Sequence, residues 1–337
     1  MSLRGADGKP LKVANQRTGP MGFKPLFGTP QRFTTPDKAN IIIVYDALNL
    51  FFTMSLAKQM GTMCTSTHIP SGQVFGTFRR IKANIKQFTR VGQRVALVFV
   101  WDNEPVAEKA ILPEYKMNRD GHQTLEEEDL NLRMDSFRAT LECLPCTFAE
   151  APEEEADHVI ATLVASYEKP TLVMSSDKDL WPLMGRDRVK MVSMRKSEVI
   201  TEAHLQDKFA LRSSRYAYKI PLYKAVMGDA SDNIPKVPRI PSKDFHAALN
   251  AFEYTEMDDC VAMLIESASK LPKPKAHKLL VEWESRVRRN LLVTTLKENL
   301  EVETLWNPGS KEGLEQIFAD FECQSFLDGG VHDFLFD

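Results

Sequence analysis

Cysteine is scarce in this chain of 337 residues. There are five, Cys64, Cys143, Cys146, Cys260 and Cys323, and so sparse and odd a set is typical of a reducing compartment and excludes a secreted disulfide framework. One C-x-x-C pair is present, but no second ligand pair or thioredoxin-like pattern accompanies it. We therefore expect these thiols to be structural and buried.

Long apolar runs and an excess of positive charge are also missing. No run reaches the roughly 18–20 residues that a membrane span requires, and the N-terminus has no signal-peptide apolar core, so we expect no membrane association. Lys and Arg number 43 against 46 Asp and Glu, a net charge of −3. That balance argues against a nucleic-acid binder, because such proteins usually carry a basic excess. Hydrophobic residues at 43% and charged residues at 26% exclude wholesale disorder and coiled coil.

The first 39 residues differ from the rest of the chain in composition and in hydrophobic pattern. They are rich in Gly and Pro, show no apolar periodicity, and hold seven Lys or Arg against two Asp. We expect a basic flexible arm over residues 1–39. An inert tail and an arm that contacts nucleic acid remain equally open interpretations.

Three short apolar runs beyond residue 39 each end in aspartate. "NIIIVYD" ends at Asp46, "RVALVFVWD" at Asp102 and "TLVMSSD" at Asp177. Such runs, separated by stretches long enough for crossover helices, are typical of parallel strands buried on both faces. Because the carboxyl ends of parallel strands share one edge of a sheet, the three carboxylates are expected at one place. We predict an α/β domain over residues 40–200 and a mainly helical lobe over residues 201–337.

Further carboxylates follow in the second half of this pattern. "APEEEADHV" opens a predicted helix with Glu155 and Asp157, Asp179 comes two residues after the third strand's aspartate, and "MGDASDN" adds Asp229 and Asp232. Clustered carboxylates repel one another and need cations. All-oxygen ligands favour Mg²⁺ or Mn²⁺ over zinc. Two such ions about 4 Å apart are a common device for phosphodiester cleavage.

The ordered motifs "VYD", "FVWD", "LPEYKMNRD", "EEEADHVIATL", "SSDKDL" and "MGDASDNIPKV" resemble the 5′-nuclease family. That family comprises flap endonucleases, bacteriophage 5′-3′ exonucleases and ribonucleases H, and the nuclease domain of bacterial DNA polymerase I. The resemblance covers residues 40 to about 335. It implies a PIN-like, mostly parallel sheet, a helical arch at about 104–135, and a helix-hairpin-helix-like element in the helical lobe.

The resemblance also implies which residues do the chemistry. It places two Mg²⁺ or Mn²⁺ ions on a first cluster of Asp46, Asp102, Glu155, Asp157 and Asp177 and a second cluster of Asp179, Asp229 and Asp232. Lys116 and Arg119 would clamp the scissile phosphate, with Asp177 also catalytic. Tyr115 would stack on the terminal base. A solvated charged helix face is the alternative for this segment.

The activity implied is metal-dependent 5′-3′ exonuclease and flap endonuclease action in DNA replication or repair. The substrates would be DNA with 5′ ends or flaps, and RNA primers in RNA–DNA hybrids. A replication partner such as a single-strand-binding protein or a clamp is implied as well. We expect a monomer in the cytoplasm of a bacterial cell or a phage-infected host.

Basic residues gather in two runs that contain no acid, 76–94 and 208–224. A run of one charge is usually a solvated face, yet two in a net acidic chain suit a phosphate track. With the hairpin residues described next, the predicted nucleic-acid contacts are Arg79, Arg80, Lys82, Lys86, Lys219, Lys236, Arg239 and Lys243.

The chain departs from the family pattern at two places. His158 stands where a second Asp is usual, so we expect an altered or water-mediated metal role or a plain core histidine. Lys236, Arg239 and Pro241 stand where the family has hairpin glycines, which weakens backbone capture of a phosphate and argues against the monovalent cation that such hairpins can hold.

Two other functions compete with an active nuclease. The His158 and hairpin changes favour a structure-selective DNA-binding protein with reduced or lost catalysis, although eight retained carboxylates oppose that interpretation. "VMSSDKD" also mimics the Asp-x-Asp of a haloacid-dehalogenase-like phosphatase. That family needs its motif near the first strand, whereas here it lies past the middle of the chain.

Overall fold

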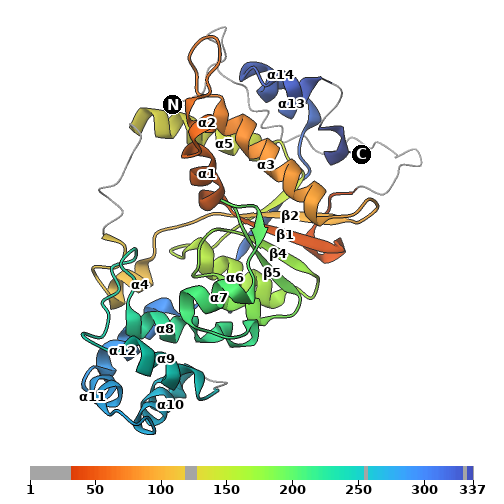
Figure 1. Cartoon of the computed structure of the whole chain (residues 1–337). Coiled ribbons are helices and arrows are strands. Elements are labelled where there is room, and N and C mark those ends of the chain that lie inside the picture. Colours follow the sequence, from red (N-terminus) through yellow and green to blue (C-terminus); the bar gives the residue numbers. More distant parts are fainter. Residues whose placement is uncertain (1–31, 118–126, 254–256, 329–331, 337) are drawn as a thin grey trace.

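The computed structural model describes residues 32–117, 127–253, 257–328 and 332–336 (Figure 1). A seven-stranded sheet in the order β6-β5-β4-β1-β2-β3-β7 lies at its centre. The five inner strands are parallel: β1 (Ile41–Asp46), β2 (Val95–Val100), β3 (Cys146–Glu150), β4 (Thr171–Met174) and β5 (Val189–Ser193). The short β6 (Glu198–Val199) and β7 (Glu303–Asn307) add antiparallel edges. The predicted α/β class with a mostly parallel sheet is confirmed.

The helices lie on both faces of this sheet and in a lobe below it (Figure 1). Those of the sheet region are α1 (Ala47–Ser55), α2 (Lys58–Thr62), α3 (Gly72–Phe88), α5 (Glu127–Glu142), α6 (Ala156–Ser166), α13 (Lys311–Asp320) and α14 (Gln324–Leu327). Those of the lobe are α7 (Glu202–Phe209), α8 (Ile220–Met227), α9 (Ser242–Asn250), α10 (Met257–Ser269), α11 (Lys275–Glu282) and α12 (Glu284–Thr294), and α4 (Val106–Ile111) lies beside α12.

The alternation of side chains along β1 divides the interior into two cores. Ile43 and Tyr45 face the core that contains α1, α3, α5 and α13. Ile42 and Val44 face the other, which runs past α6 without a break into lobe residues such as Leu222 of α8. Because sheet and lobe share this core, packing fixes the position of the lobe against the carboxyl edge of the sheet.

The C-terminal part of the chain differs from the predicted helical lobe of residues 201–337. After α12 the chain returns to the sheet, where β7 pairs with β3 along five residues and α13 packs beside α3. Phe318 of α13 is fully buried, with its ring centroid 4.8 Å from that of Phe78. Strand pairing across more than 150 residues leaves no trace in local periodicity, which is why the sequence did not show it.

The predicted arch and arm are described only in part. Within 104–135 the structure describes α4, the turn to residue 117 and the first half of α5, whose Arg133 is buried against the body of the protein. Residues 1–31 of the arm lie outside the described residues, while Phe33 bridges to Val95 and is buried. The thiols of Cys143, Cys146, Cys260 and Cys323 are free and buried as expected, whereas Cys64 is exposed. Among the described helices, none is both long and apolar enough to cross a membrane.

The placement of the C-terminal segment on the sheet can be tested by truncating one of its buried side chains. Phe318→Ala should lower the free energy of unfolding by about 3–5 kcal/mol, because it leaves a cavity between α13 and α3. Leu305→Ala on β7 truncates a side chain that is 67% exposed. This variant should change the free energy of unfolding by less than about 0.5 kcal/mol. Urea titration followed by circular dichroism measures both. Equal losses in the two variants would contradict the placement of α13 in the core.

Candidate metal centre and nucleic-acid interface

The first carboxylate of the site is the last residue of β1. Asp46 caps α1, since its Oδ1 accepts the Asn49 N–H at 2.9 Å, and its Oδ2 accepts the Ser175 hydroxyl at 3.0 Å. The side chain is buried, and this burial together with the nearby charge of Asp177 raises the pKa of Asp46 to about 7. A carboxylate here is charged at neutral pH only at a cost that a neighbouring cation would offset.

The second strand brings its aspartate to the start of α6. Asp102 Oδ1 accepts the Ala156 N–H at 2.7 Å, which ties β2 to the first turn of that helix. Asp157, one residue further, lies beside the strand-end carboxylates. Burial and the charges of Asp177 and Asp46 raise the pKa of Asp157 well above its usual value.

The carboxylates form two compact groups that share one member. Ligand oxygens of Asp157, Asp177 and Asp179 all lie within 4.8 Å of one another, and so do those of Asp179, Asp229 and Asp232. The second group matches the predicted second cluster. Of the predicted first cluster, Asp157 and Asp177 are in the first group. The other three members lie outside it and bind protein groups: Asp46 contacts Asn49 and Ser175, Asp102 contacts Ala156, and Glu155 contacts Tyr115 and Lys116.

The donor set of both groups fits a hard divalent cation. Every donor is a carboxylate oxygen, which suits Mg²⁺ or Mn²⁺. Burial and then the neighbouring carboxylates raise the pKa values of Asp46 and Asp157, so a bound cation would favour their charged forms. Lys224 of α8 supplies positive charge from within the chain, because its buried ammonium forms ion pairs with Asp179 and, at 2.7 Å, with Asp229.

The turn after α4 contacts the carboxylates from the side. The Tyr115 hydroxyl donates to Glu155 Oε2 at 2.8 Å, Lys116 forms an ion pair with the same carboxylate, and the Lys116 N–H donates to the Asp232 carbonyl at 3.1 Å. Lys116 thus lies beside Glu155 and the backbone of Asp232, and its predicted contact with a phosphate stays a prediction. Tyr115 does not match its prediction: its ring is 4% exposed and packs among apolar side chains, so no face is open for a base to stack on. Arg119 lies outside the described residues.

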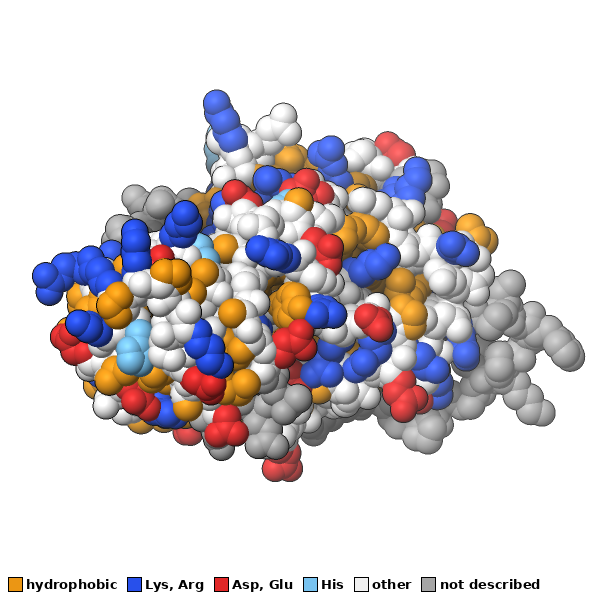
Figure 2. All heavy atoms as spheres, turned by 60° about the horizontal axis from the view of Figure 1, so that its bottom comes forward, with side chains coloured by type: hydrophobic (Ala, Val, Ile, Leu, Met, Phe, Trp, Pro, Cys, Tyr) orange, Lys and Arg blue, Asp and Glu red, His pale blue; other side chains and the backbone are white. Residues whose placement is uncertain are grey.

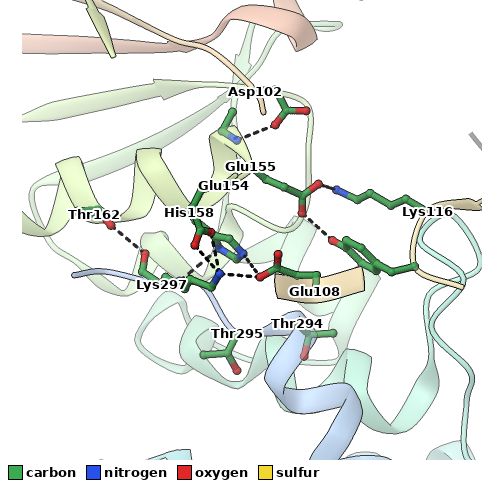
Figure 3. A network of polar contacts seen from close by, with 12 residues as sticks. Asp102, Glu108, Lys116, Glu154, Glu155, His158, Thr162, Thr294, Thr295 and Lys297 are labelled. Atoms are coloured by element: carbon green, nitrogen blue, oxygen red, sulfur yellow. Dashed lines mark hydrogen bonds and ion pairs between the residues drawn. The ribbon is translucent and has the colours of Figure 1, made fainter. Parts of the chain in front are cut away.

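His158 points away from the carboxylate groups. Its ring lies between Glu108 of α4 and the backbone N–H of Lys297, and Lys297 also contacts Glu154 (Figure 3). Of the two predicted roles, the structure shows the core histidine and not the metal ligand of the aspartate groups. Glu108 and Lys297 were missed by sequence reasoning, because their neighbours in the chain carry no motif.

The basic residues of the two runs have unequal exposure. On α3, Arg79 and Lys86 are exposed, Lys82 is half-buried, and half-buried Arg80 donates to the Ser197 hydroxyl. Figure 2, which brings the lobe end forward, shows Lys and Arg side chains spread among acidic and apolar ones and not gathered in a single uniform patch. On the face that Figure 2 shows, the basic side chains therefore lie apart from one another.

The predicted basic residues after α8 are all exposed: Lys236 and Arg239 in the hairpin, and Lys243 in the first turn of α9. Arg239 has φ +56°, in the left-handed region where glycine is favoured. Arg239 therefore adopts a backbone conformation that glycine would take without strain, and the predicted effect of missing hairpin glycines stays a prediction.

Lys219 corrects one of the predicted nucleic-acid contacts. It is 1% exposed, and its ammonium donates to the carbonyls of Leu249, at 2.8 Å, and Phe252, after the last turn of α9. Its role is to satisfy carbonyls at the end of that helix, so it cannot reach a phosphate.

Comparison with known proteins agrees with this geometry. The model of the 5′-3′ exonuclease N-terminal resolvase-like domain matches residues 41–210. DNA polymerase I of Caldicellulosiruptor bescii is 25% identical over 295 residues, 85% of this chain and 33% of that protein. The 5′-3′ exonuclease of Buchnera aphidicola from Acyrthosiphon pisum is 26% identical over 226 residues, 66% of this chain and 74% of that protein.

A solved structure with the same fold is the bacteriophage T5 D15 flap endonuclease, described as a complex with DNA and metal ions. It superposes with a TM-score of 0.54 at 20% identity and covers 88% of this chain and 98% of its own. The chain belongs to the 5′-3′ exonuclease family, within the wider class of 5′ nucleases. It spans only about a third of the length of the Caldicellulosiruptor polymerase.

The raised pKa of Asp46 predicts how stability depends on pH when divalent ions are removed. The folded protein binds a proton at Asp46 between about pH 4 and 7 that the unfolded chain releases, so stability should fall as the pH rises through this range. Thermal unfolding in EDTA at several pH values measures the slope. Asp46→Asn should flatten it, and excess Mg²⁺ should reduce it. Identical slopes in wild type and Asp46→Asn would contradict the assignment.

The exposure of the hairpin predicts which basic residues set the salt dependence of DNA binding. Lys236→Ala and Arg239→Ala should each remove one phosphate contact, and each should therefore reduce the magnitude of the slope of log K against log salt by about one. Lys219→Met should leave the slope unchanged, provided that circular dichroism shows a folded protein. Fluorescence anisotropy with a labelled duplex at several salt concentrations measures this. Unchanged slopes in both hairpin variants would exclude the hairpin from the interface.

Proposed function

We propose that this chain is a divalent-metal-dependent, structure-specific 5′ nuclease that hydrolyses phosphodiesters near the 5′ ends of DNA. The observation that carries the proposal is the pair of carboxylate groups that share Asp179, placed beside the basic turn at Lys116. Family membership supports the reaction class. We infer Mg²⁺ or Mn²⁺, two ions in number, from the all-oxygen donor sets.

In this proposal each residue has a definite task. Asp157, Asp177 and Asp179 hold one ion, and Asp179, Asp229 and Asp232 hold the other. When bound, the ions activate water and stabilise the leaving oxygen. Lys116, on the turn that faces both groups, places positive charge beside the scissile phosphate and offsets the charge that develops there. Asp46 and Glu155 lie around the first group and fix its surroundings by hydrogen bonds.

The competing function is a DNA-binding protein of the same fold without catalysis. The His158 and hairpin changes support it, but the His158 ring faces Glu108 and leaves both carboxylate groups intact. A cluster of like charges that raises the pKa of its own members is costly to keep for binding alone. The observations therefore favour catalysis. Flap DNA, nicked duplex and RNA–DNA hybrid are the substrates to compare, and a cytoplasmic replication or repair role follows from the same proposal.

Substitution of one carboxylate from each group tests the proposal. Asp177→Asn and Asp229→Asn should each lower turnover roughly a hundredfold or more, while duplex affinity changes little. Asp207→Asn on α7, where the side chain is 69% exposed, is the matched control and should match wild type. Labelled 5′-flap, nicked duplex and RNA–DNA hybrid are incubated with Mg²⁺, Mn²⁺ or EDTA, and the product ends are mapped.

Wild-type turnover in both Asn variants would exclude these carboxylates as the metal site. Tight flap binding by the wild-type protein without cleavage in either metal would establish the DNA-binding alternative.

A further inference from the structure

A buried polar network joins three segments that are remote in the sequence: α4, the first turn of α6 and the chain after α12 (Figure 3). His158 Nε2 lies 3.1 Å from Glu108 Oε1, and the Lys297 N–H donates to His158 Nδ1 at 3.3 Å. The Lys297 ammonium contacts Glu108 at 2.9 Å and Glu154 at 2.7 Å. Because Nδ1 accepts, the neutral ring carries its proton on Nε2 and donates it to Glu108.

Glu108 is the centre of this network. Its side chain is 1% exposed, and a buried carboxylate without donors would be very unfavourable. Burial alone would raise the pKa of Glu108, but the bonds from His158 and Lys297 hold it at about 2. The carboxylate therefore stays charged and bound to His158 and Lys297. These two contacts hold α4 against α6 and the segment after α12.

The same groups have the spacing of a cation site, since ligand atoms of Glu108, Glu154 and His158 lie within 4.8 Å of one another. The Lys297 ammonium contacts both glutamates and supplies the positive charge from within the chain. The network therefore has a counter-charge from within the chain, while the second oxygen of Glu108, Oε2, is buried with no hydrogen-bond partner among the described residues.

The helix that this network holds is short, and its C-terminal end packs in an apolar cluster in which Ile111 and Leu112 lie with Val293 of α12. α4 has six residues and no side-chain N-cap, and Val106 in its first turn is 44% exposed. A helix so short is unstable in isolation. Just beyond it, Leu112 N–H bonds to the Glu108 carbonyl at 2.8 Å, and Tyr115 N–H to the Leu112 carbonyl at 2.8 Å. Displacement of Glu108 would thus be passed along the backbone to the turn at Lys116.

We propose that His158 and Lys297 are positioning residues that hold α4 through Glu108 and thereby keep Lys116 at the carboxylate groups. α6 then serves the site on two sides: Asp157 faces the carboxylate groups, and His158 anchors α4, the helix that precedes the turn with Lys116. The inference rests on the proposed nuclease function for its catalytic consequence, although the anchoring of α4 does not depend on that function.

A double-mutant cycle tests the catalytic consequence. His158→Ala should lower kcat on a 5′-flap substrate roughly tenfold to a hundredfold, as expected when a reacting group is misplaced, with duplex Kd unchanged. If it acts through Lys116, the double variant with Lys116→Ala should be no slower than the slower single variant. His332→Ala is the matched control, because His332 is also buried and contacts a glutamate, Glu315. Its effect should add to that of Lys116→Ala.

Conservative variants separate positioning from simple loss of folding. His158→Gln keeps a donor for Glu108 and should retain most of the wild-type kcat. His158→Asp, the residue usual in the family, places a second carboxylate against Glu108 and should be slower than His158→Ala. Full activity in His158→Asp would overturn the proposal, because it would show that this position serves the metal site.

Hydrogen exchange gives a result that does not need cleavage. In His158→Ala, amides of residues 106–112 should exchange roughly tenfold faster than in wild type, and His332→Ala should leave them unchanged. Equal exchange in wild type and His158→Ala, or additive effects in the cycle, would overturn the proposal. Absence of any nuclease activity in wild type would overturn the proposed function instead, and the exchange result would still decide whether His158 anchors α4.

Discussion

Repulsion among the carboxylates at the carboxyl edge of the sheet is the constraint on which the rest of the structure depends. It is visible in the pKa values of Asp46 and Asp157, both raised by burial and by neighbouring acids. Two lysines partly offset it from within the chain. Lys224 lies between Asp179 and Asp229, and Lys116 contacts Glu155. The need for further positive charge is what suits the carboxylates at this edge to divalent cations.

The site is assembled from two parts of the chain that one hydrophobic core holds together. Parallel strands supply the first group, while the loop after α8 supplies Asp229 and Asp232. That loop is fixed from behind, since buried Asn290 of α12 donates to the carbonyls of Ala225 and Pro235 at 3.0 and 2.7 Å. Rigid support of this kind matters because carboxylates that repel would otherwise separate in the absence of a cation.

The net charge of −3 is compatible with DNA binding because acids and bases are used in different places. Eight of the 46 Asp and Glu residues lie in or around the two carboxylate groups, while exposed basic residues lie on α3 and on the hairpin before α9. Some charges belong to neither set. Lys219 satisfies carbonyls after α9, and Lys297 serves the network around Glu108. A count of charges therefore does not measure the nucleic-acid surface.

The sequence by itself determined the parallel sheet and the meeting of its aspartates, because strand period and strand direction are local properties that place Asp46, Asp102 and Asp177 at one edge. It could not determine what each side chain touches. Tyr115 and Lys219 look like ligand-binding residues in the sequence, yet packing buries both. His158 meets Glu108 across 50 residues and Lys297 across 139. Such contacts depend on how helices and loops pack on the sheet, so only the tertiary structure could decide them.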